Sequence, residues 1–314
     1  MTISAKRPII LDGGMGRELE RIGAPFVQPQ WSAQALIEAP HFVSQVHRSF
    51  IEAGADVITT NTYALVPFHI GEKCFNEQGA QLIKLAATLA RECVSHVAEG
   101  TGNQATKKST LVAGCIPPVL GSYRADLFIE QQAKPLLEVL IANQQVDVDF
   151  WLAETISSIA EAAMIKARTA STDKTTWMAF TITDDLNCQP TLRSGESVYA
   201  AVSAIAGQNV CAILFNCSCV EVMQAALMAA KQALADKDMT ESVQLGVYAN
   251  NFSPIGLFHE ANDNSGVSAL RTDVPPEKYS EHAVSWLNAG ASIIGGCCGV
   301  SPEHIKQLAV LKNN

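Results

Sequence analysis

The stretch Ala212-Ile213-Leu214-Phe215-Asn216-Cys217-Ser218-Cys219 joins a short apolar run to polar and sulfur-bearing residues. The apolar part has the length of a buried strand. Apolar residues then recur with helical spacing over about 220–236, and a second apolar run follows at 244–248. A strand, a helix and another strand without a long linker favour a parallel pair of strands joined by a crossover helix.

The same alternation of strands and helices repeats eight times along the chain. Strands are predicted at 9–11, 56–60, 111–114, 150–154, 177–180, 212–215, 244–248 and 292–295. Helices are predicted at about 40–53, 77–98, 134–146, 157–170, 196–206, 220–236, 277–289 and 302–312, the last with Ser301 as N-cap and Pro302 in the first helical position. Eight such units that close on themselves form a (β/α)8 TIM barrel. We therefore predict an α/β fold with a single barrel domain over 1–314, and an open doubly wound sheet is the alternative.

Composition excludes several classes of protein. Of the 314 residues, 48% are hydrophobic and 17% are charged, so the chain is not intrinsically disordered. A net charge of −9 without a Lys/Arg cluster argues against nucleic-acid and anionic-membrane partners. No apolar run approaches the about 18 residues of a membrane span, and 9–11 is too short for a signal peptide. We expect a cytoplasmic protein, with inserted polar loops at 99–110 and 251–276.

Cysteines stand at the ends of two predicted strands. The chain has nine cysteines, an odd number that makes a disulfide framework improbable in a large chain without an export signal. Cys297 and Cys298 follow the eighth strand and Cys217 follows the sixth; Cys219 is a weaker candidate because it would begin the next helix. Even-numbered strands of a barrel share an interior layer. Three thiolates with an open fourth position indicate a catalytic zinc site. Packed thiols or a redox pair are the alternatives, and the remaining cysteines are interpreted as core or incidental residues.

Two acids also follow apolar strands, Asp12 after the first and Glu154 after the fourth. They are predicted either to grip the ammonium group of an amino-acid substrate or to be buried carboxylates paired with a backbone amide or an arginine. Asp184-Asp185 is predicted to be a solvated loop pair. Neither His47 nor His259-Glu260 has a partner at metal spacing, and both are interpreted as structural or surface residues.

Several motifs along the chain resemble those of the homocysteine S-methyltransferase family, which has betaine-, S-methylmethionine- and cobalamin-dependent branches. They cover nearly the whole chain and are Asp12-Gly13-Gly14-Met15-Gly16, Ala53-Gly54-Ala55-Asp56-Val57-Ile58-Thr59-Thr60-Asn61-Thr62-Tyr63, Glu154-Thr155, Glu161-Ala162, Asn216-Cys217-Ser218 and Ile294-Gly295-Gly296-Cys297-Cys298-Gly299. The resemblance implies a (β/α)8 barrel. It also implies Zn²⁺ held by Cys217, Cys297 and Cys298, and an amino-acid substrate bound near Asp12, Gly13, Asn61 and Glu154.

The sequence departs from the family near the expected methyl donor. Arg17 stands where the family often has threonine, and Tyr248-Ala249-Asn250-Asn251-Phe252 replaces a Tyr-Pro-Asn motif. Aromatic side chains that would suit a cationic donor by cation–π contact are Tyr63, Phe180 and Phe252.

The resemblance implies zinc-dependent transfer of a methyl group from a sulfonium or ammonium donor to the thiolate of homocysteine, giving methionine. S-methylmethionine and S-adenosylmethionine are the favoured donors. The expected partners are thus a small-molecule thiol acceptor and a methyl donor, and a homo-oligomer is compatible with the family. Two alternatives stay open: a non-catalytic barrel that binds an amino acid or a thiol, and a phosphate-handling barrel enzyme that would use the glycines after the eighth strand.

Overall fold

The computed structural model describes residues 7–100, 110–254 and 269–313. Its strands are β1 (Ile9–Ile10), β2 (Val57–Thr59), β3 (Leu111–Ile116), β4 (Phe150–Ile156), β5 (Thr176–Phe180), β6 (Val210–Asn216), β7 (Gln244–Tyr248) and β8 (Ile293–Ile294). All paired neighbours are parallel, in the order β1-β8-β7-β6-β5-β4-β3-β2. A parallel bridge between Leu11 and Val57 joins the two ends of this order, so the sheet closes into a barrel.

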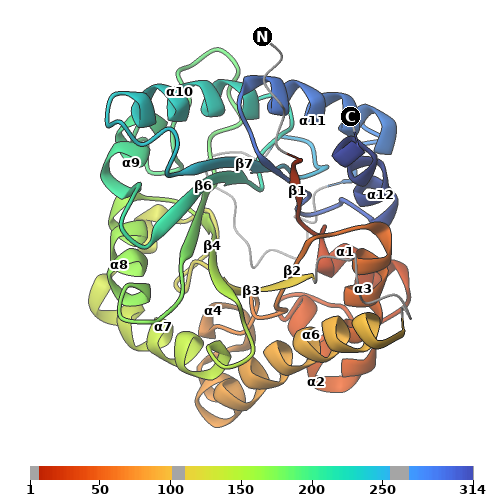
Figure 1. Ribbon diagram of the computed structural model, residues 1–314. Coiled ribbons are helices and arrows are strands. Elements are labelled where there is room, and N and C mark those ends of the chain that lie inside the picture. The colour runs from red at the N-terminus through yellow and green to blue at the C-terminus, as the bar shows by residue number, and fades with distance from the viewer. Residues whose placement is uncertain (1–6, 101–109, 255–268, 314) are drawn as a thin grey trace.

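Helices surround the ring of strands (Figure 1). They are α1 (Met15–Arg21), α2 (Ser32–Glu38), α3 (Pro40–Ala53), α4 (Pro67–Ile70), α5 (Glu72–Cys74), α6 (Ala80–Gly100), α7 (Glu130–Gln144), α8 (Ile159–Thr169), α9 (Val198–Ile205), α10 (Met223–Ala235), α11 (Pro276–Ala289) and α12 (Pro302–Val310), with a π-helical turn at Phe75–Gly79 and short 3-10 turns at Ala125–Leu127 and Leu311–Asn313. The predicted (β/α)8 barrel is confirmed, and the open doubly wound sheet is wrong.

The eight predicted strands are all present; 244–248 has the predicted bounds, and the other seven differ at one or both ends. The prediction missed α1, α2 and the short helical segments before α6, because each is too short to show a helical repeat of apolar residues. Ser301 is the N-cap of α12, and Pro302 begins it, as predicted. Most of the two predicted inserted loops lies outside the described residues. In the part of the chain that the structure describes, none of the helices combines the length and the apolar character that crossing a bilayer requires.

Alternation along the strands fills the barrel with apolar side chains. In β4, Phe150 and Leu152 belong to a buried cluster inside the barrel, with Ala212 and Leu214 of β6. Because successive side chains of a strand point to opposite faces, Glu154 of β4 and Asn216 of β6 continue the inward face.

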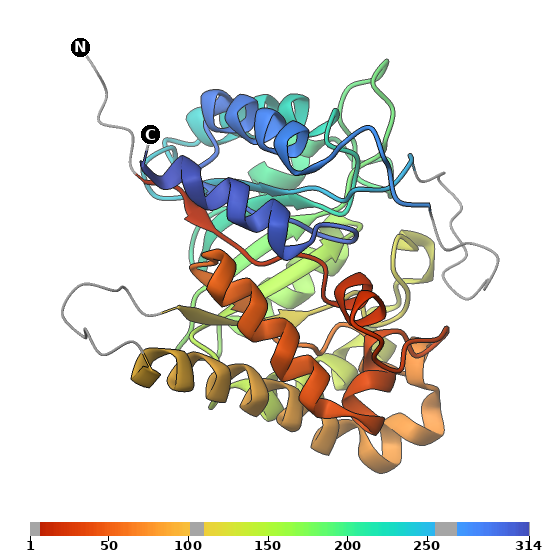
Figure 2. The ribbon, with the colours of Figure 1, turned by 90° about the vertical axis from the view of Figure 1, so that its right-hand side faces the viewer.

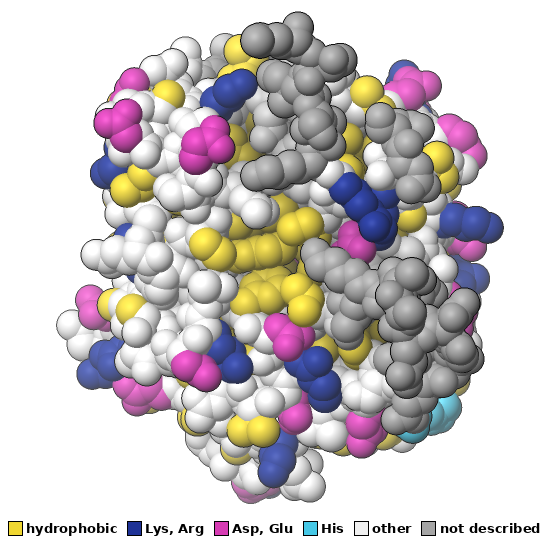
Figure 3. Space-filling view, viewed as in Figure 1, with side chains coloured by type: hydrophobic (Ala, Val, Ile, Leu, Met, Phe, Trp, Pro, Cys, Tyr) yellow, Lys and Arg dark blue, Asp and Glu magenta, His cyan; other side chains and the backbone are white. Residues whose placement is uncertain are grey.

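The two ends of the barrel differ in character. Figure 3 shows the end from which the strands start, where hydrophobic side chains gather in the middle of the face. Figure 2 shows the barrel from the side, with the strands running towards the opposite end. The polar residues that follow the strands therefore meet at that opposite end, which is where barrel enzymes carry their sites.

Candidate metal and substrate site

Three cysteine sulfurs meet at the carboxyl end of the barrel. Cys217 directly follows β6, and Cys297 and Cys298 follow β8. Their Sγ atoms all lie within 4.8 Å of one another. The Sγ atom of Cys217 is 2.7 Å from that of Cys297 and 3.8 Å from that of Cys298. Cys219 does not join this cluster, since its Sγ lies 3.8 Å from the backbone oxygen of Phe252.

The donor set fits a thiophilic metal ion. Zinc–sulfur bonds of about 2.3 Å in a tetrahedral site place two sulfurs about 3.8 Å apart, which is the spacing of Cys217 and Cys298. Cys217 and Cys297 lie closer than that but are free thiols. The hydrogen bonds from Cys217 and then from Cys297 lower the pKa of the Cys298 thiol well below its usual value, and the charge of Arg17 adds to this effect. Hydrogen bonding within the cluster and burial raise the pKa of Cys217 and of Cys297, so only one of the three sulfurs is favoured as a thiolate.

The side-chain amide of Asn216 holds the carboxyl ends of β4 and β6 together. The Asn216 Oδ1 atom accepts a hydrogen bond from the Thr155 backbone N–H at 2.9 Å, and its Nδ2 donates to the Thr155 Oγ1 at 2.9 Å. Thr155 and Cys217 both have left-handed backbones, with φ of 62° and 51°. This region is unfavourable for a residue with a β-carbon, and most of all for a β-branched one. Asn216 thus stabilises the two turns that aim Glu154 and Cys217, a role that the sequence analysis missed.

Glycines allow the first and last motifs to approach each other. A β-carbon on Gly14 would lie 2.7 Å from the backbone oxygen of Cys297, and one on Gly13 would lie 2.3 Å from that of Val300. Gly13 therefore lines the cavity through its backbone. The loop after β1 can lie against the cysteine turn only because neither residue has a side chain.

The two predicted acids also lie at this end. The Asp12 carboxylate accepts hydrogen bonds from the Thr59 backbone N–H at 2.7 Å and from the Thr59 hydroxyl at 3.1 Å. Glu154 accepts one from the Cys115 thiol at 2.9 Å and one from the Tyr248 hydroxyl at 3.4 Å. Cys115, which the sequence analysis interpreted as a core or incidental residue, therefore contacts the site.

Burial raises the pKa of both acids. Desolvation raises the pKa of Asp12 to about 8, to which the neighbouring Glu154 contributes, and it raises that of Glu154 to about 7. Among the described residues, Asp12 pairs with a backbone amide, as one alternative predicted, and with no arginine. An ammonium group placed beside these two carboxyls would favour their charged forms.

A cavity connects the acids, the thiols and a set of aromatic rings. Asp12, Gly13, Asn61, Glu154 and all three clustered cysteines line it. The Asn61 amide donates to the Ser32 backbone oxygen at 3.1 Å, which ties the loop after β2 to α2. The aromatic side chains that line the cavity are Phe26, Trp31, Tyr63, Tyr123, Tyr248 and Phe252.

The structure corrects one aromatic prediction and adds Phe26, Trp31, Tyr123 and Tyr248. Phe180 is fully buried in the hydrophobic core and does not line the cavity, because it lies on the face of β5 that packs against the helices. Phe26 and Trp31 belong to the segment before α2, and their ring centroids lie 5.7 Å apart. No strand precedes them directly, so the search of strand ends missed both. His47 is buried in α3, and His259-Glu260 lies outside the described residues.

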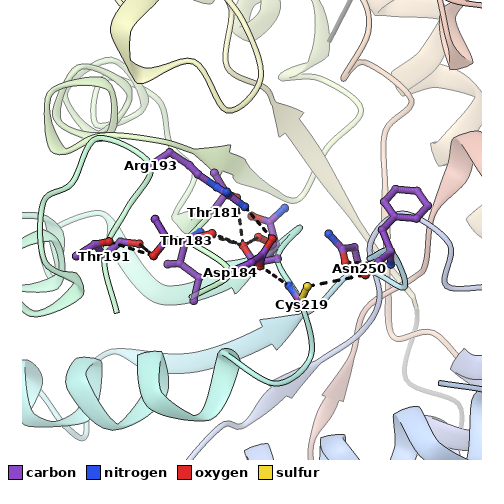
Figure 4. A network of polar contacts seen from close by, with 11 residues as sticks. Thr181, Thr183, Asp184, Thr191, Arg193, Cys219 and Asn250 are labelled. Atoms are coloured by element: carbon purple, nitrogen blue, oxygen red, sulfur yellow. Dashed lines mark hydrogen bonds and ion pairs between the residues drawn. The ribbon is translucent and has the colours of Figure 1, made fainter. Parts of the chain in front are cut away.

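The prediction of a solvated Asp184-Asp185 pair is wrong for Asp184 (Figure 4). Its carboxylate lies 3.2 Å from the Arg193 guanidinium, and these two side chains are 2% and 1% exposed. The carboxylate also accepts a hydrogen bond from the Cys219 backbone N–H at 2.8 Å. The partner is nine residues away across a hairpin, which is why the local sequence did not reveal it. Asp184 thus connects the loop after β5, through its hydrogen bond with Cys219, to the turn that carries Cys217.

Arg193→Met should lower the free energy of unfolding by about 3–5 kcal/mol, because it leaves the Asp184 carboxylate buried and without its cation. Urea denaturation followed by circular dichroism measures the effect. The matched control is Asp173→Asn. Asp173 pairs with Lys174 at 3.9 Å, and its side chain is 88% exposed. That exchange should not change the unfolding midpoint. Equal effects of the two exchanges would contradict the importance of the buried pair.

A second buried acid supports the loop after β4. Glu161, in the first turn of α8, accepts a hydrogen bond from the Ser157 backbone N–H at 3.1 Å. Burial raises its pKa from 4.5 to about 7. The folded protein therefore retains a proton on Glu161 that the unfolded chain releases in this window, so this residue makes folding less stable as pH rises from 4.5 to 7.

Glu161→Gln should remove this contribution. Relative to the wild type, the variant should gain about 3 kcal/mol of stability between pH 4.5 and 7, since a shift of one pKa unit corresponds to about 1.4 kcal/mol. Urea unfolding of both proteins at the two pH values gives the difference. A difference between variant and wild type that does not change with pH would show that Glu161 has an ordinary pKa in the folded protein.

Comparison with known proteins agrees with these observations. A family model described as homocysteine S-methyltransferase matches residues 9–311. The chain is 28% identical to a homocysteine S-methyltransferase of Escherichia coli, over 96% of this chain and 94% of that protein. It is 27% identical to a selenocysteine methyltransferase of Astragalus bisulcatus, over 96% and 91% of the two chains.

A solved structure has the same fold. The metallated form of the homocysteine methyltransferase MmuM from Escherichia coli superposes with a TM-score of 0.76 at 25% identity. The alignment covers 97% of this chain and 96% of that one. Together with the convergent thiols, the metallated relative indicates a metal site in this chain.

Proposed function

Because the chain belongs to the homocysteine S-methyltransferase family, we propose that it transfers a methyl group from a sulfonium donor to the thiolate of homocysteine and that its metal is zinc. The observation that carries the proposal is the convergence of Cys217, Cys297 and Cys298 within 4.8 Å. Three thiolates suit zinc, and a four-coordinate ion held by them would have one position free for the incoming thiol.

Methyl transfer to sulfur requires the acceptor as a thiolate. A free thiol with a pKa of about 8.5 is only about 3% ionised at pH 7, a deficit of about 2 kcal/mol. Zinc, when bound, supplies the Lewis acidity that keeps a coordinated thiol deprotonated. No general base is then needed, and the acids of the cavity serve to bind the substrate.

Asp12 and Glu154 orient the acceptor in this proposal. Their buried carboxyls accept the ammonium group of homocysteine, and the hydrogen bonds from Thr59 to Asp12 and from Cys115 to Glu154 hold them in place. Gly13 and Asn61, in the loops after β1 and β2, also line the cavity and would lie beside the acceptor. Fixing the acceptor by its ammonium group aims its sulfur at the cysteine cluster.

The aromatic rings suit a cationic donor. Phe26, Trp31, Tyr63 and Phe252 line the cavity. Aromatic faces attract sulfonium and ammonium groups by cation–π contact. Attack by the thiolate neutralises the charge of the sulfonium, and a cavity that excludes water favours this more than bulk solvent does. We propose S-methylmethionine or S-adenosylmethionine as the donor.

The direct test is methionine formation from homocysteine with each of three donors: S-methylmethionine, S-adenosylmethionine and betaine. The proposal predicts methionine with at least one of the two sulfonium donors and loss of activity after chelation of the metal. A protein that binds homocysteine but forms no methionine with any donor would instead be a non-catalytic member of the family. Selenocysteine is a second acceptor to include, because one relative carries its name.

A further inference from the structure

Arg17 is the only lysine or arginine among the described residues that line the cavity. It lies in α1, its side chain is 17% exposed, and its guanidinium carbon is 5.5 Å from the centroid of the Phe252 ring. The other basic group there, His69, has its pKa lowered to about 4 by burial and is neutral at pH 7. The cavity therefore combines two acids, Asp12 and Glu154, with one permanent cation.

This charge pattern matches the two ends of an α-amino acid. We propose that Arg17 binds the carboxylate of an amino-acid substrate in this cavity, while Asp12 and Glu154 bind an ammonium group. The inference rests on the proposed function, because homocysteine and S-methylmethionine both carry a carboxylate. The planar guanidinium can donate two parallel hydrogen bonds to that carboxylate.

Two features of the structure support this role. The Phe252 ring fixes one face of the guanidinium, so little side-chain entropy is lost when a carboxylate binds. Arg17 pairs with the Glu20 carboxylate at 2.6 Å, and the Glu20 side chain is 51% exposed. Because the Glu20 end of this pair faces solvent, which weakens an ion pair, a substrate carboxylate can share or replace the contact.

The test compares ligands that differ only in the carboxylate. Calorimetry on the zinc-loaded protein measures the affinities of L-homocysteine and of 3-aminopropane-1-thiol, which lacks the carboxylate. The donor pair is S-methyl-L-methionine and (3-aminopropyl)dimethylsulfonium. In the wild type, the ligand without the carboxylate should bind about 10- to 100-fold more weakly than its partner in one of these pairs, as expected for a charged hydrogen bond. The pair that responds identifies whether Arg17 binds the acceptor or the donor.

In Arg17→Gln, the ratio of the affinity for the ligand with a carboxylate to the affinity for the ligand without one should fall close to one. The affinity for the ligand that lacks a carboxylate should not change. The matched control is Glu20→Gln, which breaks the same ion pair but keeps the cation, and it should retain the wild-type ratio. Circular dichroism checks that both variants are folded. A ratio that Arg17→Gln leaves unchanged for both pairs, or that Glu20→Gln abolishes equally, would overturn the inference.

The calorimetric result is independent of turnover. A wild type that discriminates by carboxylate through Arg17 but forms no methionine would support the carboxylate site and refute the proposed function. A wild type that forms methionine, with a ratio insensitive to Arg17, would refute only the carboxylate site.

Discussion

Cys298→Ser should yield a folded barrel that retains little metal and forms no detectable methionine. Loss of a residue that merely supports a metal ligand typically lowers metal affinity by about 10- to 100-fold, and loss of a thiolate ligand should cost more. The Cys298 side chain contributes one of the three converging sulfurs and lies outside the two hydrophobic clusters, so the fold should not depend on it. Elemental analysis of the purified variant measures the metal, and far-ultraviolet circular dichroism measures the fold.

Cys219→Ser is the matched control. Cys219 is buried and lies only two residues after Cys217, but its sulfur contacts the Phe252 backbone and not the cluster. This variant should keep both metal and activity. If Cys298→Ser retained a full equivalent of metal, or if Cys219→Ser lost it, the assignment of the three ligands would be wrong.

Glu154→Gln should raise the KM for homocysteine by about 10- to 100-fold, because a charged hydrogen bond to the ammonium group is replaced by a neutral one. Glutamine keeps the size of the side chain and leaves the three cysteines in place, so the metal content should not change. Initial rates at several homocysteine concentrations, with saturating donor, separate KM from kcat.

Glu138→Gln controls for the removal of a negative charge as such. Glu138 lies in α7, is 53% exposed and pairs with Arg168 at 3.3 Å, outside the cavity. Its exchange should leave KM unchanged. An unchanged KM in Glu154→Gln, with kcat lowered instead, would show that Glu154 acts on the reacting atoms and does not anchor the acceptor.

Much of the fold follows from local pattern. Buried strands such as Phe150–Ile156 and Val210–Asn216 begin with continuous apolar runs, and the intervening helices show apolar spacing. The position of Glu154 after an apolar run already made it a candidate for the site, and alternation along β4 explains why it faces inward. The sequence also suggested the cysteine triad, because residues after parallel strands meet at one end of a barrel.

The residues that the sequence did not reveal depend on contacts between distant segments. The Asp184–Arg193 pair forms across a hairpin, and two aspartates in a loop otherwise resemble a solvated pair. The hydrogen bonds between Asn216 and Thr155 join β6 to β4 across the barrel. The left-handed backbones that they stabilise, at Thr155 and Cys217, are a feature of the folded chain and not of its sequence. Neither contact has a local pattern, because the first depends on how the loop after β5 folds and the second on how the sheet closes.

X-ray absorption at the zinc edge tests the central claim most directly, because it counts the sulfur atoms around the metal in the native protein. The account predicts one zinc per chain with three sulfur ligands at about 2.3 Å, and a fourth sulfur after homocysteine is added. A protein without zinc, or a zinc ion surrounded only by nitrogen and oxygen, would contradict it.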